Sequence, residues 1–160
     1  MALEKAEIKA GYPLPSYCYQ VTVMTDGGDA DLLGCSEVSG LKLTYDPVIY
    51  RHGLSYATGM HIIPGMRQPV KLTLKRGVAP GQSYLKDWLQ ETFEDPGSDK
   101  VHRDLVIDLC DEAAVPVVRW TVSGAMPTSI DAPAFSASSN EVSFESLELT
   151  ANDLRIEFDP

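Results

Sequence analysis

The sequence predicts a mainly β domain in which antiparallel strands interleave in one sandwich, together with a single α-helix and a long protruding hairpin. Apolar residues recur at every second position along most of the 160 residues, which is the period of a half-buried strand. Only one segment, near residues 84–93, has the three- and four-residue spacing of an amphipathic helix. A long, Gly-rich and partly apolar excursion separates two strand-like runs between residues 41 and 74.

The first strand is expected directly after Pro13 and Pro15, because each proline fixes its own φ and biases the preceding residue away from helix. Apolar side chains then alternate along one face of this strand, at Tyr17, Tyr19, Val21 and Val23. Residues 26–29, with two central glycines, are typical of a hairpin turn. A short strand over 32–38 follows, and Gly40 ends it.

The excursion is the most informative segment of the chain. Alternating apolar residues over 41–51 and again over 70–74 predict two strands that pair as one long hairpin. The tip of this hairpin, residues 53–65, would then project from the body. Long connections within a domain are uncommon and usually functional, and exposed apolar surface usually marks a contact with another protein.

A helix of about three turns is predicted next. Its apolar face contains Tyr84, Leu85, Trp88, Leu89 and Phe93. Ser83 is suited to be the N-cap, and Asp87 lies near the positive end of the helix dipole. The Pro-Gly pair at 96–97 ends the segment.

Alternation predicts four further strands, over residues 105–109, 118–122, 142–149 and 154–158. A loop that contains Pro127 and Pro133 is expected before the third of them, and a turn at 152–153 before the fourth. The alternation changes phase between Phe144 and Leu147, which indicates either a β-bulge or a strand that is covered on both faces.

Length and charge limit the classes of function. The chain is expected to form one domain over residues 12–160, preceded by a lead-in over 1–11. Its 13 Lys and Arg residues stand against 23 Asp and Glu residues. This acidic balance would repel a phosphate backbone and an anionic membrane surface, so we expect no specific nucleic-acid binding and no membrane insertion. No apolar run approaches membrane-spanning length.

Cysteine usage indicates a reducing compartment. The chain has three cysteines, Cys18, Cys35 and Cys110. This odd number without CxxC spacing argues against a disulfide framework, and buried thiols are the simplest interpretation. The lead-in has no apolar core of the kind found in a signal peptide, so we expect no ordinary secretory route.

The sequence contains no convincing metal or cofactor site. Three histidines are scattered over expected loops, His52, His61 and His102. None has a His or Cys partner at a ligand spacing, so we expect no zinc site. Three aspartates superficially resemble a calcium loop, Asp26, Asp29 and Asp31. Their spacing misses the required pattern and no bidentate Glu follows, so a solvated turn explains them better.

No catalytic set is found either, and the sequence predicts that the protein is not an enzyme. No Gly-x-Ser-x-Gly elbow and no phosphate-binding glycine motif is present. The carboxylates of Asp108, Asp111 and Glu112 are better explained by a hairpin turn than by an acid/base pair. Trp88 and Trp120 each continue an apolar face and are expected in the core.

Six short strings occur in a fixed order: YPLPS at 12–16, SEVSGL at 36–41, IYRHG at 49–53, PGMR at 64–67, LTLKRG at 72–77 and SSNEV at 138–142. In this order and spacing they resemble the tail-tube proteins of contractile phages and of phage-tail-like extracellular contractile injection systems. The resemblance covers about residues 12–158. Type VI secretion tube proteins are similar in fold, although these strings resemble the phage and injection-particle branch more.

The resemblance implies a β-sandwich or barrel with one flanking helix. It also implies that six copies close into a ring, and that rings stack into a hollow inner tube that a contractile sheath drives through a target envelope. The partners would be further copies of the chain, adjacent tube or baseplate proteins, the sheath, and cargo in the lumen. Such a protein would be made in the bacterial cytoplasm without a signal peptide and would end in an extracellular particle or a phage virion.

By the same analogy the hairpin would contact the adjacent ring. Its predicted interface residues are Tyr50, Arg51, Ile62, Ile63, Pro64, Met66 and Arg67. The two arginines would pair with acids of the neighbouring copy, since the planar guanidinium suits carboxylates, although plain solvent exposure explains them equally well.

Two alternatives remain at this point. Relative to shorter family members the 53–63 stretch looks expanded, which fits a tube-initiating, baseplate-proximal ring of the same particle. A more remote alternative is a β-sandwich ligand-binding module, for example for carbohydrate. That module would be a stable monomer with an exposed aromatic platform.

Overall fold

The computed structural model describes residues 12–25, 28, 30–98 and 100–160. Its elements are, in chain order, β1 (Tyr19–Met24), β2 (Ala30–Leu33), β3 (Glu37–Ser39), β4 (Val48–Tyr50), α2 (Ser55–Thr58), β5 (His61–Ile63), β6 (Val70–Gly77), α3 (Tyr84–Glu94), β7 (Arg103–Cys110), β8 (Pro116–Asp131), β9 (Phe144–Ala151) and β10 (Asp153–Phe158). The predicted lead-in and most of the predicted 26–29 turn lie outside the described residues.

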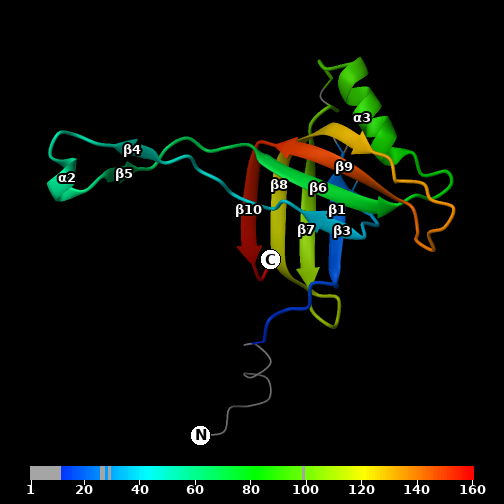
Figure 1. Ribbon diagram of the computed structural model, residues 1–160. Coiled ribbons are helices and arrows are strands. Elements are labelled where there is room, and N and C mark those ends of the chain that lie inside the picture. The colour runs from blue at the N-terminus through cyan, green and yellow to red at the C-terminus, as the bar shows by residue number, and fades with distance from the viewer. Residues whose placement is uncertain (1–11, 26–27, 29, 99) are drawn as a thin grey trace, which may run out of the picture.

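Eight strands are joined by hydrogen bonds in the order β2-β1-β7-β8-β9-β6-β3, with β10 also paired to β8. All of these pairings are antiparallel. The path folds into two layers, and β6 and β9 cross in front of β1, β7 and β8 (Figure 1). The predicted class is confirmed as a mainly β, two-layer antiparallel fold, but among the described strands the end strands β2 and β3 do not pair to close a barrel.

The long strand β8 belongs to both layers. Its first part pairs with β7 and β10, and its last part pairs with β9. The strand changes layer at Gly124, whose φ is +65°, and a Cβ there would lie 2.4 Å from Nδ2 of Asn152. The Gly124 N–H donates to Oδ1 of Asp104 at 2.8 Å. The carboxylate of Asp104, on the neighbouring strand β7, thus gives a hydrogen-bond partner to the Gly124 N–H, which the bend in β8 removes from regular strand pairing.

The core lies between the two layers. One layer contributes Val21, Val23, Leu105, Ile107 and Val122, and the other contributes Val70, Leu72, Leu74, Leu147 and Leu149. In each strand these residues alternate with more exposed positions, which is the period the sequence predicted. Tyr17, predicted to continue the β1 face, instead lies before the strand and is exposed.

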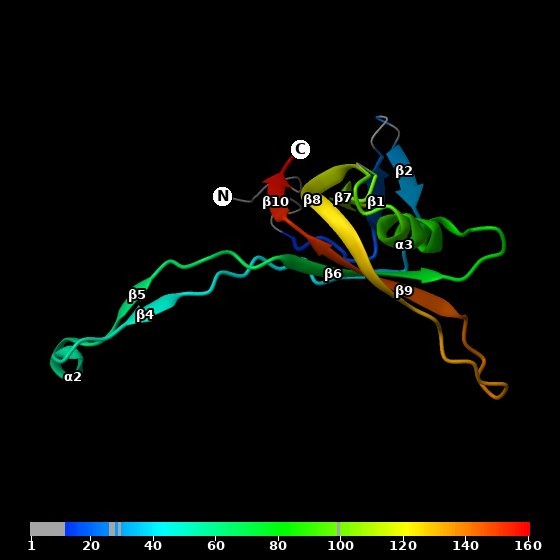
Figure 2. The same ribbon diagram turned by 90° about the horizontal axis from the view of Figure 1, so that it is seen from above.

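Helix α3 packs against this core and confirms the predicted amphipathic segment. Leu85 and Trp88 are buried, whereas Phe93, predicted on the same face, is 62% exposed. Ser83 is the N-cap residue but makes no side-chain cap hydrogen bond; its hydroxyl contacts Oδ2 of Asp87 at 2.5 Å. In the figures α3 lies at the end of the body opposite the long hairpin (Figures 1 and 2).

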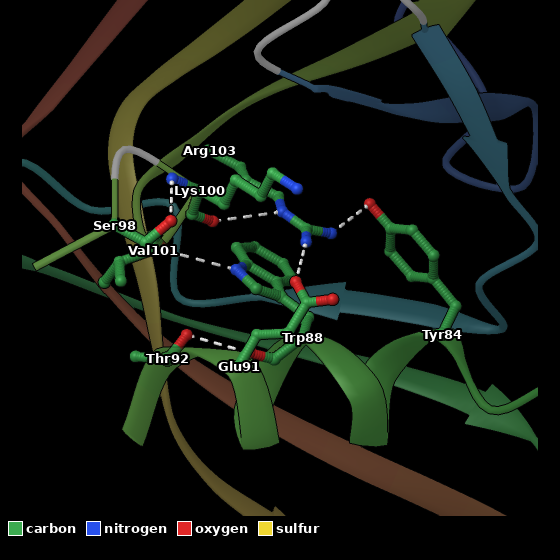
Figure 3. A network of polar contacts seen from close by, with 8 residues as sticks. All are labelled: Tyr84, Trp88, Glu91, Thr92, Ser98, Lys100, Val101 and Arg103. Atoms are coloured by element: carbon green, nitrogen blue, oxygen red, sulfur yellow. Dashed lines mark hydrogen bonds and ion pairs between the residues drawn. The ribbon is translucent and has the colours of Figure 1, made fainter. Parts of the chain in front are cut away.

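A buried arginine ties α3 to the sheet (Figure 3). Arg103 begins β7 and is 8% exposed. Its guanidinium donates to the Tyr84 hydroxyl at 2.8 Å and to Oε2 of Glu91 at 3.0 Å, and it lies 4.9 Å from the Trp88 ring centroid. The indole N–H of Trp88 donates to the carbonyl of Val101 at 3.2 Å. The helix is therefore held by polar contacts as well as by packing.

Three details of the predicted strands are corrected. Residues 40–47 form no strand and make one isolated bridge, Tyr45 to Arg67. Gly40, where β3 has just ended, has a φ of +88° and packs so closely on Lys71 that a Cβ would lie 2.4 Å from the Lys71 carbonyl oxygen. Pro127 lies inside β8, fully buried, at a register shift where a proline is tolerated.

The third correction concerns the ends of the last two strands. β9 begins at Phe144, and Val142 before it is exposed. The pairing of β9 with β6 is continuous from Phe144 to Ala151, so no bulge lies in that pair. Phe144 therefore projects from the face of the strand opposite to that of Leu147, which accounts for the change of phase in the sequence. The turn predicted at 152–153 does not reverse the chain. β9 and β10 follow one another along the same edge of β8, both antiparallel to it, with a kink at Asn152 between them.

Candidate assembly surfaces

A thin arm, defined here as residues 46–67, projects far from the body (Figures 1 and 2). Its strands β4 and β5 pair with each other, with Val48 opposite Ile63 and Tyr50 opposite His61. The short helix α2 lies at the tip. A protruding hairpin was predicted correctly, but not its pairing: β6 pairs with β3 and β9, and the arm strands pair within the excursion itself.

The arm is apolar and uncovered on both faces. Every residue of β4 and β5 is exposed. Large exposed apolar side chains occur along its whole length, namely Val48, Ile49, Tyr50, Leu54, Tyr56, Met60, Ile62, Ile63 and Met66. An antiparallel sheet of a soluble domain usually packs one face on a core, and neither face of this ribbon does so. Exposed apolar surface of this extent is typical of a protein contact.

The tip is ordered by its own hydrogen bonds. The N–H of His52 donates to the Ser55 hydroxyl at 2.7 Å, and the N–H of Leu54 donates to Nδ1 of His52 at 3.1 Å. The Thr58 hydroxyl donates to the carbonyl of Leu54 at 3.0 Å. Gly59 then reverses the chain with a φ of +81°. The tip therefore presents a defined shape to a partner.

The base of the arm is held by close backbone contacts. The N–H of Asp46 donates to the carbonyl of Met66 at 2.9 Å, and the N–H of Gln68 donates to the carbonyl of Thr44 at 2.9 Å. A Cβ at Gly65 would lie 1.7 Å from the carbonyl oxygen of Asp46, so only glycine fits this approach.

Arg67 fixes the base of the arm to the body. Its guanidinium forms a hydrogen-bonded ion pair with Oδ1 of Asp153, and it also donates to the carbonyl of Leu154 at 3.4 Å. The guanidinium lies 6.0 Å from the ring centroid of Tyr45. The hydrogen bond from Arg67 is the main cause that lowers the pKa of Asp153 below its ordinary value of 3.8.

The arm differs in charge from the rest of the chain. Residues 47–66 contain Arg51, His52 and His61 and no acid, in a chain with a formal net charge of −10. Within the part that the structure describes, no ion pair involves Arg51. The arm is therefore suited to an acidic and apolar partner surface, and the chain as a whole carries an excess of acidic residues.

A second candidate surface is the free edge of the sheet. β10 pairs only with β8, and β2 pairs only with β1, so each leaves one edge without a described strand partner. On β10 the side chains of Ile156 and Phe158 alternate with polar residues, yet they are 45% and 74% exposed. Unpaired edges are ready templates for another chain.

All seven predicted interface residues lie on the arm. Tyr50 is in β4, Ile62 and Ile63 are in β5, and Arg51, Pro64 and Met66 lie beside these strands. Arg67, at the base, already has a partner in its own chain. The sequence interpretation missed Ile156 and Phe158 as exposed residues, because period-two alternation is the same for a buried strand and for an edge strand that awaits a partner.

The described residues contain no group of three or more possible metal ligands. His52 and His61, which the sequence separates, lie with ring centroids 6.2 Å apart across the arm. Asp108 accepts two hydrogen bonds from Arg119, at 2.7 and 2.9 Å, so the two residues form an ion pair between neighbouring strands. Oδ1 of Asp111 accepts from the N–H groups of Ala113 and Val115, as expected for a turn. No helix in the described part is long and apolar enough to cross a membrane.

Comparison with solved structures gives similar chains over nearly the full length. A chain of the PVC extracellular contractile injection system, in its extended sheath-tube complex, has a TM-score of 0.81 and 30% identity, covering 98% of this chain and 99% of that one. A chain of the anti-feeding prophage tube-terminating cap has a TM-score of 0.79 and 31% identity, covering 99% and 95%. A chain of the anti-feeding prophage baseplate has a TM-score of 0.81 and 23% identity, covering 92% and 97%, which shows the shared fold alone.

No curated protein sequence gives a significant match. A family model does: residues 15–155 match the family described as T4-like virus tail tube protein gp19. The family and the solved relatives are structural components of tail-like particles rather than enzymes, as the sequence predicted. The chain therefore belongs to the T4-like tail tube protein family.

Proposed function

We propose that this chain is the inner-tube subunit of a phage-tail-like contractile injection particle, in which six copies close into a ring and rings stack into a hollow conduit for cargo. The observation that carries the proposal is the arm, whose apolar residues are exposed on both faces and whose base is fixed to the body. The likeness to a chain of a sheath-tube complex over almost the whole length supports it. The protein would be made in the bacterial cytoplasm and assembled into an extracellular particle.

In this proposal the arm makes the axial contact between rings. Its apolar ribbon would be buried against a copy in the adjacent ring, and Arg51 would pair with an acid of that copy. Arg67 is paired with Asp153 of its own chain, and in this proposal that pair also sets the direction in which the arm leaves the body. The free edges of β2 and β10 support closure within a ring, because heterologous contacts between identical subunits satisfy every edge when the ring closes.

The test separates folding from stacking. Removal of residues 54–63, or the double substitution Ile62→Ser and Ile63→Ser, is expected to leave a folded protein that forms rings but short tubes or none. Val115→Ser is the matched control, since Val115 is also exposed and lies in a turn far from the arm in sequence. Tube length is measured in electron micrographs and folding by circular dichroism. Unchanged tube length in the arm variants would reject the axial role.

Arg51→Glu tests the charge of the arm without disturbing its base. Arg51 has no ion pair in the described part of the chain, so its reversal is expected to leave the fold intact and to shorten tubes most at low salt. Arg67→Glu would instead break the pair with Asp153 and change the arm and its attachment together.

A ring at one end of the tube is the second candidate, and the 31% identity to a chain of a tube-terminating cap favours it. The chain's fold is also found in a baseplate chain. The assembly state of the purified protein distinguishes a bulk tube subunit from an end ring. A bulk subunit polymerises alone into long tubes at high concentration, whereas an end ring stops at single or double rings and co-purifies with a baseplate or cap protein.

A further inference from the structure

Two of the three thiols face each other across neighbouring strands. Where β1 pairs with β7, Tyr19 lies opposite Leu109, so the next opposed pair is Cys18 and Cys110. The N–H of Cys110 donates to the carbonyl of Cys18 at 2.8 Å. Directly opposed residues of an antiparallel pair project from the same face, with Cα atoms about 5.5 Å apart when they are hydrogen-bonded. Disulfides span Cα separations of about 4.4–6.8 Å.

Cys18 is also among the groups that act on the Cys110 thiol. Burial raises the pKa of the Cys110 thiol, and nearby groups, including a hydrogen bond with the Cys18 thiol, raise it further. Cys110 is fully buried, whereas Cys18 is half-buried. The pair therefore consists of one thiol that a small reagent can reach and one that it cannot. Both are free in the structure.

The third cysteine is outside this pair. Cys35 packs partly against the hydrophobic core, and its carbonyl accepts a hydrogen bond from the Tyr19 hydroxyl at 2.8 Å. Tyr19 points to the core side of β1, and side chains alternate along a strand, so Cys18 points to the other side. Burial raises the pKa of the Cys35 thiol to about 11, which keeps it protonated and unreactive.

We propose that Cys18 and Cys110 are an oxidation site, and that they form an intrachain disulfide when the protein passes from a reducing to an oxidising environment. That change of environment rests on the proposed function, in which the assembled particle is extracellular; the pairing itself does not. The odd cysteine count hid the pair from sequence reasoning, which treated all three thiols alike.

The chemistry requires an external oxidant, and a small disulfide such as oxidised glutathione is sufficient. The Cys18 thiolate attacks one sulfur of the oxidant, which expels one glutathione thiolate and leaves a mixed disulfide. Cys110 then attacks Sγ of Cys18, and its proton passes to the departing second glutathione thiolate. Two protein thiols and one small disulfide thus become one protein disulfide and two small thiols.

The bond would fasten the point where the chain enters the sheet. Cys18 immediately precedes β1, and Cys110 ends β7, so the link joins the start of one strand to the end of its neighbour. A cross-link between residues so distant in sequence restricts the unfolded chain strongly. The released particle would gain stability that the newly made subunit does not need.

The test uses the purified full chain. It is incubated with oxidised glutathione at pH 8, the remaining thiols are blocked with N-ethylmaleimide in denaturant, and intact mass and peptide mapping follow. The expected product carries one maleimide, on Cys35, and a Cys18–Cys110 linked peptide, whereas the untreated denatured chain carries three. Cys35→Ser is the matched control and should form the same link, and Cys18→Ser should form no intrachain disulfide.

Any of three outcomes would overturn the assignment. They are three blocked thiols after prolonged oxidation, a stable mixed disulfide at Cys18 that Cys110 does not resolve, and a disulfide that includes Cys35. The same mapping on protein from cells and on released particles tests the change of environment. A link that forms in the purified chain but is absent from released particles would leave the chemistry intact and contradict its proposed use. Tube formation by Cys18→Ser, examined in parallel, shows whether the proposed function stands independently.

Discussion

Replacement of Arg103 by methionine is expected to loosen α3 from the sheet. Arg103 is nearly buried and has three kinds of contact there: the hydroxyl of Tyr84, the carboxylate of Glu91 and the face of Trp88 (Figure 3). Methionine retains most of the aliphatic stem but none of the donors. The Tyr84 hydroxyl and the Glu91 carboxylate then each lose their hydrogen bond from Arg103.

The size of the effect follows from these contacts. A hydrogen bond to a charged group contributes about 1.5–3 kcal/mol, and a desolvated cation–π contact about 1–2 kcal/mol. The contributions are not additive, and the Glu91 side chain is 54% exposed, so solvent can satisfy its carboxylate. We therefore expect a loss of about 3 kcal/mol, a large part of the roughly 5–15 kcal/mol that stabilises a typical domain.

Urea unfolding followed by circular dichroism measures this loss. With a slope near 2 kcal/mol per molar urea, the midpoint should fall by about 1.5 M. Glu91→Gln should lower the free energy of unfolding by no more than about 1 kcal/mol, and Arg103→Lys should lie between the two because an ammonium cannot span both partners. A midpoint for Arg103→Met within about 0.3 M of the unsubstituted protein would refute the view that this arginine anchors α3.

Two further predictions concern the bend and the base of the arm. Gly124→Ala should lower the free energy of unfolding in urea by about 2–3 kcal/mol, because Gly124 has a φ of +65° and the added Cβ would clash with Asn152. The second substitution Asn152→Gly in the same chain should remove the clash but not the backbone strain, so it should restore only part of the lost stability. Full recovery would exclude backbone strain as a cause. Because the folded-state pKa of Asp153 lies below its ordinary value of 3.8, its pairing with Arg67 stabilises the fold above that value and is lost as pH falls through the folded-state pKa. The stability difference between the unsubstituted protein and Asp153→Asn should therefore be present at pH 7 and shrink below pH 3.8, and an unchanged difference would contradict the ion pair.

The parts of the fold that depend on local periodicity were predictable, and those that depend on contacts between distant residues were not. The spacing around Trp88 predicts α3, and the alternation of Leu105 and Ile107 predicts β7, because burial of one face requires that period. Pro127 and Pro133 indicate a loop, so the sequence predicted an end at a point where β8 continues to Asp131. The strand persists there because Asp104, from another strand, satisfies the bend.

The candidate site divides in the same way. The long, Gly-rich and partly apolar excursion predicts a protruding hairpin, and the structure confirms that an arm is present. Its attachment could not be predicted, since Arg67 and Asp153 are 86 residues apart and neither position has a local pattern that reveals the other. For the same reason Arg67 had been grouped with Arg51, although one is paired within its chain and the other has no described ion pair.

The arm also presents a thermodynamic problem that only a partner resolves. β4 and β5 have three residues each, and an isolated two-stranded ribbon is at best marginally stable in water. Selection for stability alone would shorten such a segment or make it polar. Instead the chain has a glycine at position 65 where the two sides of the arm approach closely, an ion pair at the base and an ordered tip. These three features hold the arm in a shape that leaves its apolar side chains exposed. These features are explained together if the free energy that stabilises the arm comes from its burial against another copy, so the arm should show rapid amide exchange in free subunits and strong protection in assembled tubes.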